Sequence, residues 1–276
     1  MRIEQRNNIR INQPATPADG APIATIVFAH GFGCDQTMWR YLEPMFRDRY
    51  RTVLFDLVGS GGSDLSAYDF DSYTSLQAHA DDLLQVVKAV SDGPVICIGH
   101  SVSSMTALLA SIAEPRYFAA QVMLAPSPCY VDDPDAGYYG GFSRADIDDL
   151  LGAMDSNYLG WASTMAPVIM GTPGQPALGE ELAHSFCRTD PNIALHFART
   201  TFLSDHRADL PRNTTPALIV QCDDDFIAPM PVGDYLRANL PHSTLQVIEN
   251  MGHCPHMSAP QACHAPIRAF LDSLHL

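Results

Sequence analysis

Short runs of apolar residues alternate with helical patterns along most of the chain. The runs at 25–29, 52–55, 95–98, 121–125, 217–222 and 245–248 are rich in β-branched residues and almost continuously hydrophobic. Buried strands of a parallel sheet have this pattern, because both of their faces are covered. Apolar residues recur at helical spacing in the intervening segments 72–90, 102–113 and 260–274. Alternating strands and helices predict an α/β fold with a mostly parallel, doubly wound sheet.

The alternation stops between about residues 128 and 211. Strand patterns disappear there, and clusters of Pro, Gly and Asp separate helical segments at 143–154, 158–168, 180–187 and 193–202. We therefore predict an α/β core formed by residues 1–128 and 209–276, with a helical cap at 129–208. A cap would cover the carboxyl edge of the sheet, where ligands of open α/β sheets bind. A packing appendage is the alternative.

A serine lies at the sharpest junction between a predicted strand and a predicted helix. The strand at 95–98 is followed by Gly-His-Ser at 99–101, and a helical pattern starts at Val102. A serine on such a turn projects its hydroxyl out of the backbone, which is the geometry of a nucleophile elbow. Ser101 is therefore the predicted nucleophile.

An acid and a histidine follow this serine in the order found in α/β-hydrolases. His253 would take the proton of the Ser101 hydroxyl, and an aspartate would hold the imidazole in the required tautomer. The acid lies in a run of three aspartates that follows the strand at 217–222. The spacing to Pro229 favours Asp225, and Asp224 is the reserve candidate.

The turn after the first long strand supplies a second part of the predicted site. His-Gly-Phe-Gly occupies residues 30–33, and in this fold that turn provides one backbone amide of the oxyanion hole. The amides of Phe32 and Val102 are the predicted donors, which leaves the Phe32 side chain free to form a pocket wall. Ser103 stands where glycine usually follows the nucleophile; we expect the turn to survive with a small shift of the helix.

Composition and charge exclude several partner classes. The net charge of −15 argues against binding to nucleic acid or to an anionic membrane. The seven cysteines are scattered without a CxxC pair, which suits free thiols in the cytoplasm. The first residues lack the apolar core of a signal peptide, and no apolar run approaches the length of a membrane span. We expect a cytoplasmic protein.

Two clusters resemble other kinds of site. Gly-His-Cys-Pro-His at 252–256 could suggest a metal, but His253 is needed as the base, so we predict no metal ligand there. Cys254 in this cluster is either a packing residue, which we favour, or a thiol facing the pocket. The glycine-rich segment at 59–63 lacks the Gly-Lys-Ser/Thr of a phosphate loop, and we expect a tight turn.

Several longer motifs resemble the RsbQ family of α/β-hydrolases, which regulate the bacterial sigma-B energy-stress response, and the similar plant karrikin and strigolactone receptors. The likeness extends from about residue 8 to the C-terminus, although the segment 12–22 suggests a longer first hairpin. The motifs lie at 32–36, 59–65, 67–69, 126–130, 138–142, 204–207 and 252–258.

The resemblance implies a four-helix, V-shaped cap over an apolar pocket, without metal or cofactor. It assigns the nucleophile, acid and base to Ser101, Asp225 and His253, and the oxyanion donors to Phe32 and Val102. Where the strigolactone receptors have a cap tyrosine, this chain has methionine. The implied pocket residues are Tyr130, Phe142, Trp161, Met165 and Phe197.

Two main functions follow. The first is a serine hydrolase acting on small apolar esters or lactones. The second is a ligand-sensing protein, a monomer or weak dimer, that activates a regulatory phosphatase in stress signalling. Hydrolysis of a carbon–carbon bond would use the same residues, whereas haloalkane dehalogenation requires a carboxylate where this chain has Ser101.

Overall fold

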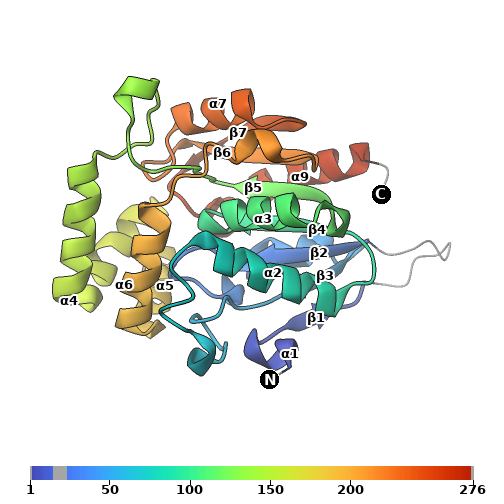
Figure 1. Ribbon diagram of the computed structural model, residues 1–276, viewed down its shortest axis with the longest axis horizontal. Helices are drawn as coiled ribbons and strands as arrows, with labels where there is room; N and C mark the ends of the chain where they lie inside the picture. Colours follow the sequence, from blue (N-terminus) through green and yellow to red (C-terminus); the bar gives the residue numbers. More distant parts are fainter. Residues whose placement is uncertain (1, 15–23, 275–276) are drawn as a thin grey trace.

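A seven-stranded sheet forms the centre of the molecule (Figure 1). The computed structural model describes residues 2–14 and 24–274, so most of the expected hairpin at 12–22 lies outside the described residues. The strand order is β1-β3-β2-β4-β5-β6-β7, and only β1 is antiparallel to its neighbour. The mostly parallel sheet expected from the sequence is confirmed. The strands are β1 (Arg10–Asn12), β2 (Thr25–Ala29), β3 (Arg51–Leu54), β4 (Val95–His100), β5 (Phe118–Leu124), β6 (Ala217–Asp224) and β7 (Ser243–Met251).

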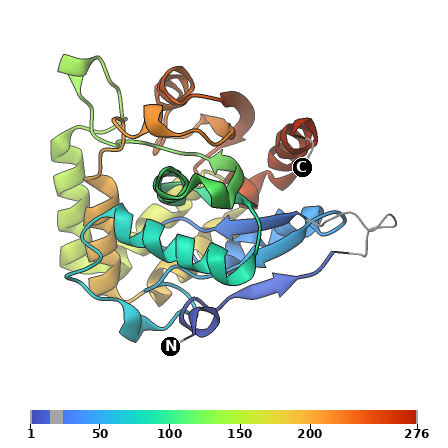
Figure 2. The same cartoon turned by 45° about the vertical axis from the view of Figure 1, so that its right-hand side comes forward.

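Helices cover both faces of the sheet, and three of them lie beyond its carboxyl edge (Figures 1 and 2). The α-helices are α1 (Ile3–Arg6), α2 (Leu76–Val90), α3 (Val102–Ala113), α4 (Arg144–Met170), α5 (Pro176–Arg188), α6 (Pro191–Phe202), α7 (Met230–Asn239), α8 (Pro255–Ser258) and α9 (Pro260–Ser273). The 3-10 helices are η1 (Gln36–Tyr41), η2 (Glu43–Phe46), η3 (Leu65–Ala67), η4 (Pro115–Tyr117), η5 (Pro134–Ala136) and η6 (Leu210–Arg212).

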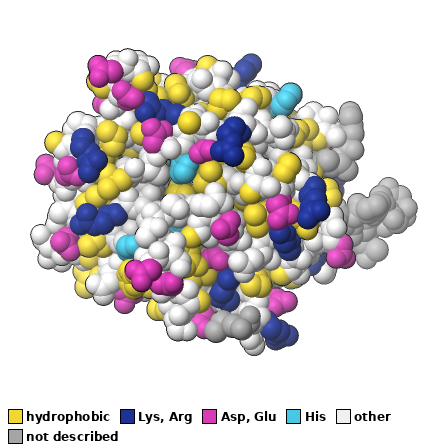
Figure 3. Space-filling view, viewed as in Figure 1, with side chains coloured by type: hydrophobic (Ala, Val, Ile, Leu, Met, Phe, Trp, Pro, Cys, Tyr) yellow, Lys and Arg dark blue, Asp and Glu magenta, His cyan; other side chains and the backbone are white. Residues whose placement is uncertain are grey.

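Alternate residues of the central strands enter two separate cores. In β2, Val27 and Ala29 pack with α2, α3 and α7, while Ile26 and Phe28 pack with η1, η2 and α9. Both sets are fully buried, which explains why the strands have no polar alternation in the sequence. On the face shown in Figure 3, acidic and basic side chains are interspersed.

The segment between β5 and β6 contains α4, α5 and α6. Asn157 has non-helical angles (φ −158°, ψ 81°) and divides α4 into two arms, so this segment has four helical pieces. The two arms match the separate helices expected at 143–154 and 158–168. The limits of the cap at 129–208 remain a prediction.

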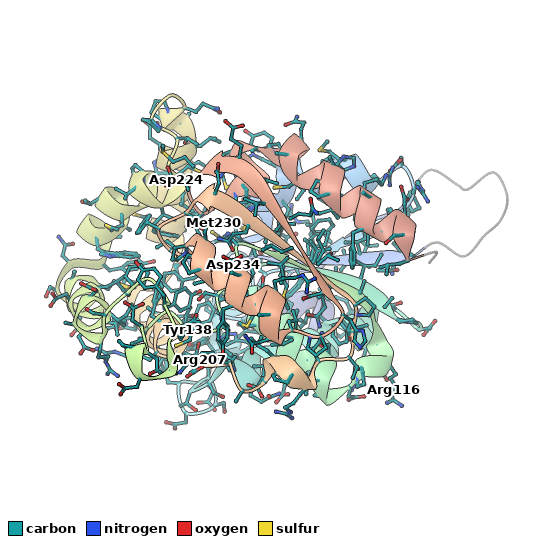
Figure 4. The ribbon with its side chains drawn as sticks, turned by 90° about the horizontal axis from the view of Figure 1, so that it is seen from above. Arg116, Tyr138, Arg207, Asp224, Met230 and Asp234 are labelled. Atoms are coloured by element: carbon teal, nitrogen blue, oxygen red, sulfur yellow. The ribbon has the colours of Figure 1, made fainter. Side chains whose placement is uncertain are left out.

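The two ends of this segment are joined to each other. Cys129 and Asp205 form an antiparallel bridge, and Arg207 pairs with Asp205 (2.6 Å) and Asp133 (2.9 Å). Figure 4 shows Arg207 beside Tyr138, whose ring lies 4.8 Å from the guanidinium carbon. These contacts fix where the helices α4–α6 leave and re-enter the core.

The strand order places the ends of β2 and β4 next to each other. From β2 the chain continues to β3 on one side, and from β4 it continues to β5 on the other. Ligands of open α/β sheets bind at such a switch point, because the two departing turns leave a crevice between them. Among the described helices, none combines the length and apolar character needed to cross a lipid bilayer.

Two buried histidines make the fold sensitive to acid. His79 and His256 are 1% and 0% exposed, and neither ring has a hydrogen-bond partner among the described residues. Burial lowers the pKa of each to about 3. In the unfolded chain a histidine titrates near about 6.5. The unfolded state therefore binds more protons between these pH values, and the free energy of unfolding falls as the pH falls through this window.

We predict that His79→Phe reduces this acid sensitivity. His79 packs against Phe197 and Tyr73 with ring centroids 4.4 and 4.9 Å apart, so phenylalanine can fill the space. Relative to wild type, the variant should gain about 2 kcal/mol on going from pH 8 to pH 5, because one histidine no longer charges on unfolding. Urea unfolding at both pH values measures the difference; an equal pH dependence in both proteins would contradict the prediction.

Candidate active site

The turn between β4 and α3 holds Ser101 in a conformation that few side chains adopt. Its backbone angles are φ 54° and ψ −124°, and its N–H donates to the Leu124 carbonyl at 2.8 Å. The turn is tight because α3 passes directly over Gly99: a Cβ at Gly99 would lie 2.7 Å from the Ser103 carbonyl oxygen. This is the strained strand-to-helix turn expected of a nucleophile elbow.

A continuous hydrogen-bond chain joins three buried side chains. His253 Nε2 lies 2.8 Å from Ser101 Oγ, and His253 Nδ1 lies 2.7 Å from Asp225 Oδ2. The carboxylate can only accept, so Nδ1 carries the proton and Nε2 accepts the proton of the serine hydroxyl. All three side chains are less than 10% exposed. This arrangement can transfer the serine proton to the imidazole.

Of the three consecutive aspartates, the structure places Asp225 against the imidazole. Its other oxygen, Oδ1, accepts from the amides of Ile227 (2.9 Å) and Ala228 (3.3 Å), which fixes the carboxylate. Asp224 is exposed at the end of β6 (Figure 4) and is not bonded to His253. The reserve candidate therefore has no contact with the base.

The two expected oxyanion donors lie on the turns that meet at the switch point. Phe32 follows β2, and Val102 is the first residue of α3. In the described part of the chain, neither amide donates a hydrogen bond. Free amides beside a nucleophile can bind the negative oxygen of a tetrahedral intermediate.

Ser103 connects these two turns. It is fully buried, and its hydroxyl donates to the His30 carbonyl. His30 is fixed in turn, because its Nε2 accepts from the Leu57 amide at 3.0 Å. From the sequence we expected Ser103 only to displace the helix slightly. The structure shows a hydrogen bond between α3 and the turn that carries Phe32.

The side chain of Ser101 opens into a narrow cavity of about 40 Å³. Pockets for drug-sized ligands measure roughly 300–1,000 Å³, so a ligand larger than a few atoms requires this cavity to widen. Phe32 and Tyr130 line the cavity. Further lining residues are Cys34, His100, Ile169, Leu182, Phe186, Thr201, Phe202, Ile227 and Cys254.

Four side chains expected in the pocket do not line this cavity. Trp161 lies behind Phe186, with which it stacks at 5.6 Å, and Phe197 lies behind Phe32 at 5.6 Å. Phe142 packs on Phe226, and Met165 is half-buried on α4. Phe186 and Phe202 occupy the inner layer instead. The resemblance assigned aromatic residues of this segment to the pocket, but the rotation of the helices decides which of them face inward.

The loop carrying His253 is attached to the end of α4. The His253 amide donates to the Ile169 carbonyl at 2.8 Å. Gly252 has φ +92°, and a Cβ there would lie 2.1 Å from the Met170 carbonyl oxygen. His100 donates from Nε2 to the His253 carbonyl at 2.8 Å. The base is therefore held from both the core and the helical segment.

Burial favours the uncharged forms of four ionisable groups around the cavity. It raises the pKa of Tyr130 to about 12 and the pKa of the Cys34 and Cys254 thiols well above their usual value, while it lowers that of His100. Cys254 both packs in the core and faces the cavity. Among the described residues, no group of three His, Cys, Asp or Glu side chains is arranged to hold a metal.

Comparison with known proteins identifies a matching family and several similar proteins. A model described as "Alpha/beta hydrolase family" matches residues 26–265. Karrikin insensitive 2 receptor IA of Petunia hybrida is 39% identical over 88% of both chains, and strigolactone esterase D14 of Arabidopsis thaliana is 36% identical over 85% of this chain and 87% of its own. The structure of olei00960, a hydrolase from Oleispira antarctica, is similar with a TM-score of 0.92 and 40% identity, covering 98% of this chain and 96% of its own.

We predict that Ser103→Ala weakens both stability and turnover. The His30 carbonyl would lose its buried donor, which should cost about 1–3 kcal/mol in the free energy of unfolding. The Phe32 turn would also be held less firmly, so kcat for an ester should fall while KM changes little. Urea unfolding and steady-state kinetics measure both effects. Loss of stability with unchanged kcat would show that the link has no positioning role.

Proposed function

Because this chain belongs to the alpha/beta hydrolase family, we propose that it cleaves small, largely apolar esters or lactones through Ser101, His253 and Asp225. One observation carries this proposal: the hydrogen-bond chain from Asp225 through His253 ends at a serine on a strained turn, facing an apolar cavity. An isolated serine hydroxyl is a poor nucleophile, and a bonded imidazole is what activates it.

In the proposed mechanism, Ser101 Oγ attacks the carbonyl carbon while His253 Nε2 takes its proton. The amides of Phe32 and Val102 bind the oxyanion of the tetrahedral intermediate. His253 then protonates the leaving alkoxide, and an acyl group remains on Ser101. A water molecule, deprotonated by His253, releases the acid. In a lactone the leaving group stays attached to the acyl chain.

The substrate class follows from the cavity and the relatives. Aromatic and aliphatic side chains form most of its wall, which favours an apolar ligand. Relatives at 36% and 35% identity are named strigolactone esterases, and this supports a lactone-containing ligand. Of the residues that the resemblance assigned to the pocket, Phe142, Trp161, Met165 and Phe197 would contact a ligand only after the cavity widens.

A ligand-sensing function is the second candidate. The cavity of about 40 Å³ must widen to admit a ligand larger than a few atoms, and a movement of the helices α4–α6 that widened it would change the outer surface of the molecule. Relatives at 37–39% identity are named karrikin insensitive 2 receptors. In this function, a cytoplasmic monomer or weak dimer would activate a regulatory phosphatase, with slow hydrolysis resetting the sensor.

We predict that Asp225→Asn and Asp224→Asn separate the function of these neighbours. Asp225→Asn should lower kcat for para-nitrophenyl acetate by about 10⁴-fold, because asparagine favours the wrong imidazole tautomer. Asp224→Asn, the matched control, should retain wild-type kcat because Asp224 is exposed and does not contact His253. Ser101→Ala should lose hydrolysis and also the covalent adduct that a sulfonyl fluoride forms on wild type. Hydrolysis by Ser101→Ala at the wild-type rate would overturn the proposal.

The sensing function predicts a measurable effect on a partner. A purified stress-response phosphatase with a sensory domain should gain activity when wild-type protein and a cleavable ester are added together. Ser101→Ala should not support this gain if hydrolysis is required, and should support it if ligand binding is sufficient. No activation by either protein would count against a phosphatase partner.

A further inference from the structure

A threonine hydroxyl in the cavity wall has no hydrogen-bond partner among the described residues. Thr201 lies on α6 and lines the cavity together with Ser101. The residue is 1% exposed, and its hydroxyl makes no hydrogen bond to any described residue. A buried hydroxyl without a partner lowers stability, because the bonds it made to water in the unfolded chain are not replaced. Such a group calls for a specific explanation.

Other helical threonines in this chain satisfy their hydroxyls locally. Thr106 donates to the Val102 carbonyl, Thr164 to that of Gly160, and Thr200 to that of His196, in each case four residues earlier in the chain. This bond is the usual one for threonine in a helix. The Thr201 hydroxyl does not make it, although Thr200 beside it does. Its hydroxyl is therefore left without a local partner, on a residue that lines the cavity.

The surroundings of Thr201 on the side of the helical segment are apolar. Ile169, Leu182, Phe186 and Phe202 come from α4, α5 and α6 and also line the cavity. The other polar side chains of the wall include Ser101, His100 and His253 from the core, and Tyr130, which lies between β5 and α4. The Thr201 hydroxyl makes no bond to the chain of Ser101, His253 and Asp225. A ligand that fills the cavity would meet Thr201 in addition to that chain.

From this arrangement we propose that Thr201 binds a second oxygen of the substrate, apart from the scissile ester or lactone. This inference rests on the proposed hydrolase function and narrows its substrate class. The preferred substrate carries an ether, carbonyl or hydroxyl oxygen in its otherwise apolar part, and the Thr201 hydroxyl donates to that oxygen. A wholly hydrocarbon chain would leave the hydroxyl buried without a partner, which is how a polar site rejects an apolar analogue.

Thr201→Val tests the proposal, because valine keeps the shape of threonine and removes the hydroxyl. Two pairs of esters have equal chain lengths and differ by one ether oxygen in place of a methylene. Para-nitrophenyl ethoxyacetate is compared with para-nitrophenyl pentanoate, and ethoxyethyl acetate with pentyl acetate. The measured quantity is the ratio of kcat/KM within a pair, compared between variant and wild type. Intrinsic differences in ester reactivity cancel in this comparison.

We expect the preference of wild type for the ether ester, in at least one pair, to fall about three- to tenfold in Thr201→Val. The melting temperature of the variant should stay equal or rise, since an unpaired buried hydroxyl has been removed. Thr164→Val, on the exposed side of α4, should leave the ratio unchanged. An unchanged ratio in both pairs, or a lower melting temperature with equal losses for both esters, would overturn the proposal and assign Thr201 a packing role.

A binding measurement keeps this test separate from the hydrolase proposal. Affinities of the same esters for Ser101→Ala and for the double variant Ser101→Ala/Thr201→Val are compared by calorimetry, where no turnover is needed. A selective loss of affinity for an ether ester supports the second binding site even if wild type proves unable to hydrolyse any ester. Equal affinities in both proteins contradict it, whatever the result of the kinetic assay.

Discussion

The site depends on one backbone constraint, the left-handed conformation of Ser101 between β4 and α3. It turns the chain so sharply that α3 crosses Gly99 with its backbone in contact. The turn exposes the serine hydroxyl and leaves the Val102 amide free at the first turn of the helix, where donors have no intrahelical partner. Strain of this kind persists only where the surroundings enforce it, and buried strands on both sides of β4 do so here.

The remaining parts of the site are attached to this turn by hydrogen bonds. Ser103 joins α3 to the turn after β2, and His100 holds the backbone of His253. The His253 amide also bonds to Ile169 at the end of α4. His253 is therefore connected to a helix that lines the cavity. A rearrangement of α4 on ligand binding would act directly on the loop that carries the imidazole.

The cavity combines an apolar wall with few polar groups, which suits selection of a small ligand by shape and by one or two oxygens. Burial keeps Tyr130 and the nearby thiols protonated. These groups therefore add no charge to the lining, and an oxyanion formed there would be stabilised mainly by fixed backbone donors. Electrostatic interactions of this kind are strongest where water is excluded.

The sequence by itself determined the α/β fold, the elbow serine and the helical character of the segment after β5, because these depend on local periodicity and on short motifs. The sequence favoured Asp225 over Asp224, and the tertiary structure shows the physical difference between them: consecutive residues point in different directions, so that Asp225 bonds to His253 and Asp224 is exposed. The tertiary structure also gave Ser103 a bonding partner 73 residues away along the chain. The rotation and packing of the helices likewise decided that Phe186, Phe202 and Thr201 form the inner wall. Trp161 and Phe197 lie behind this wall. Local sequence pattern does not specify these rotations.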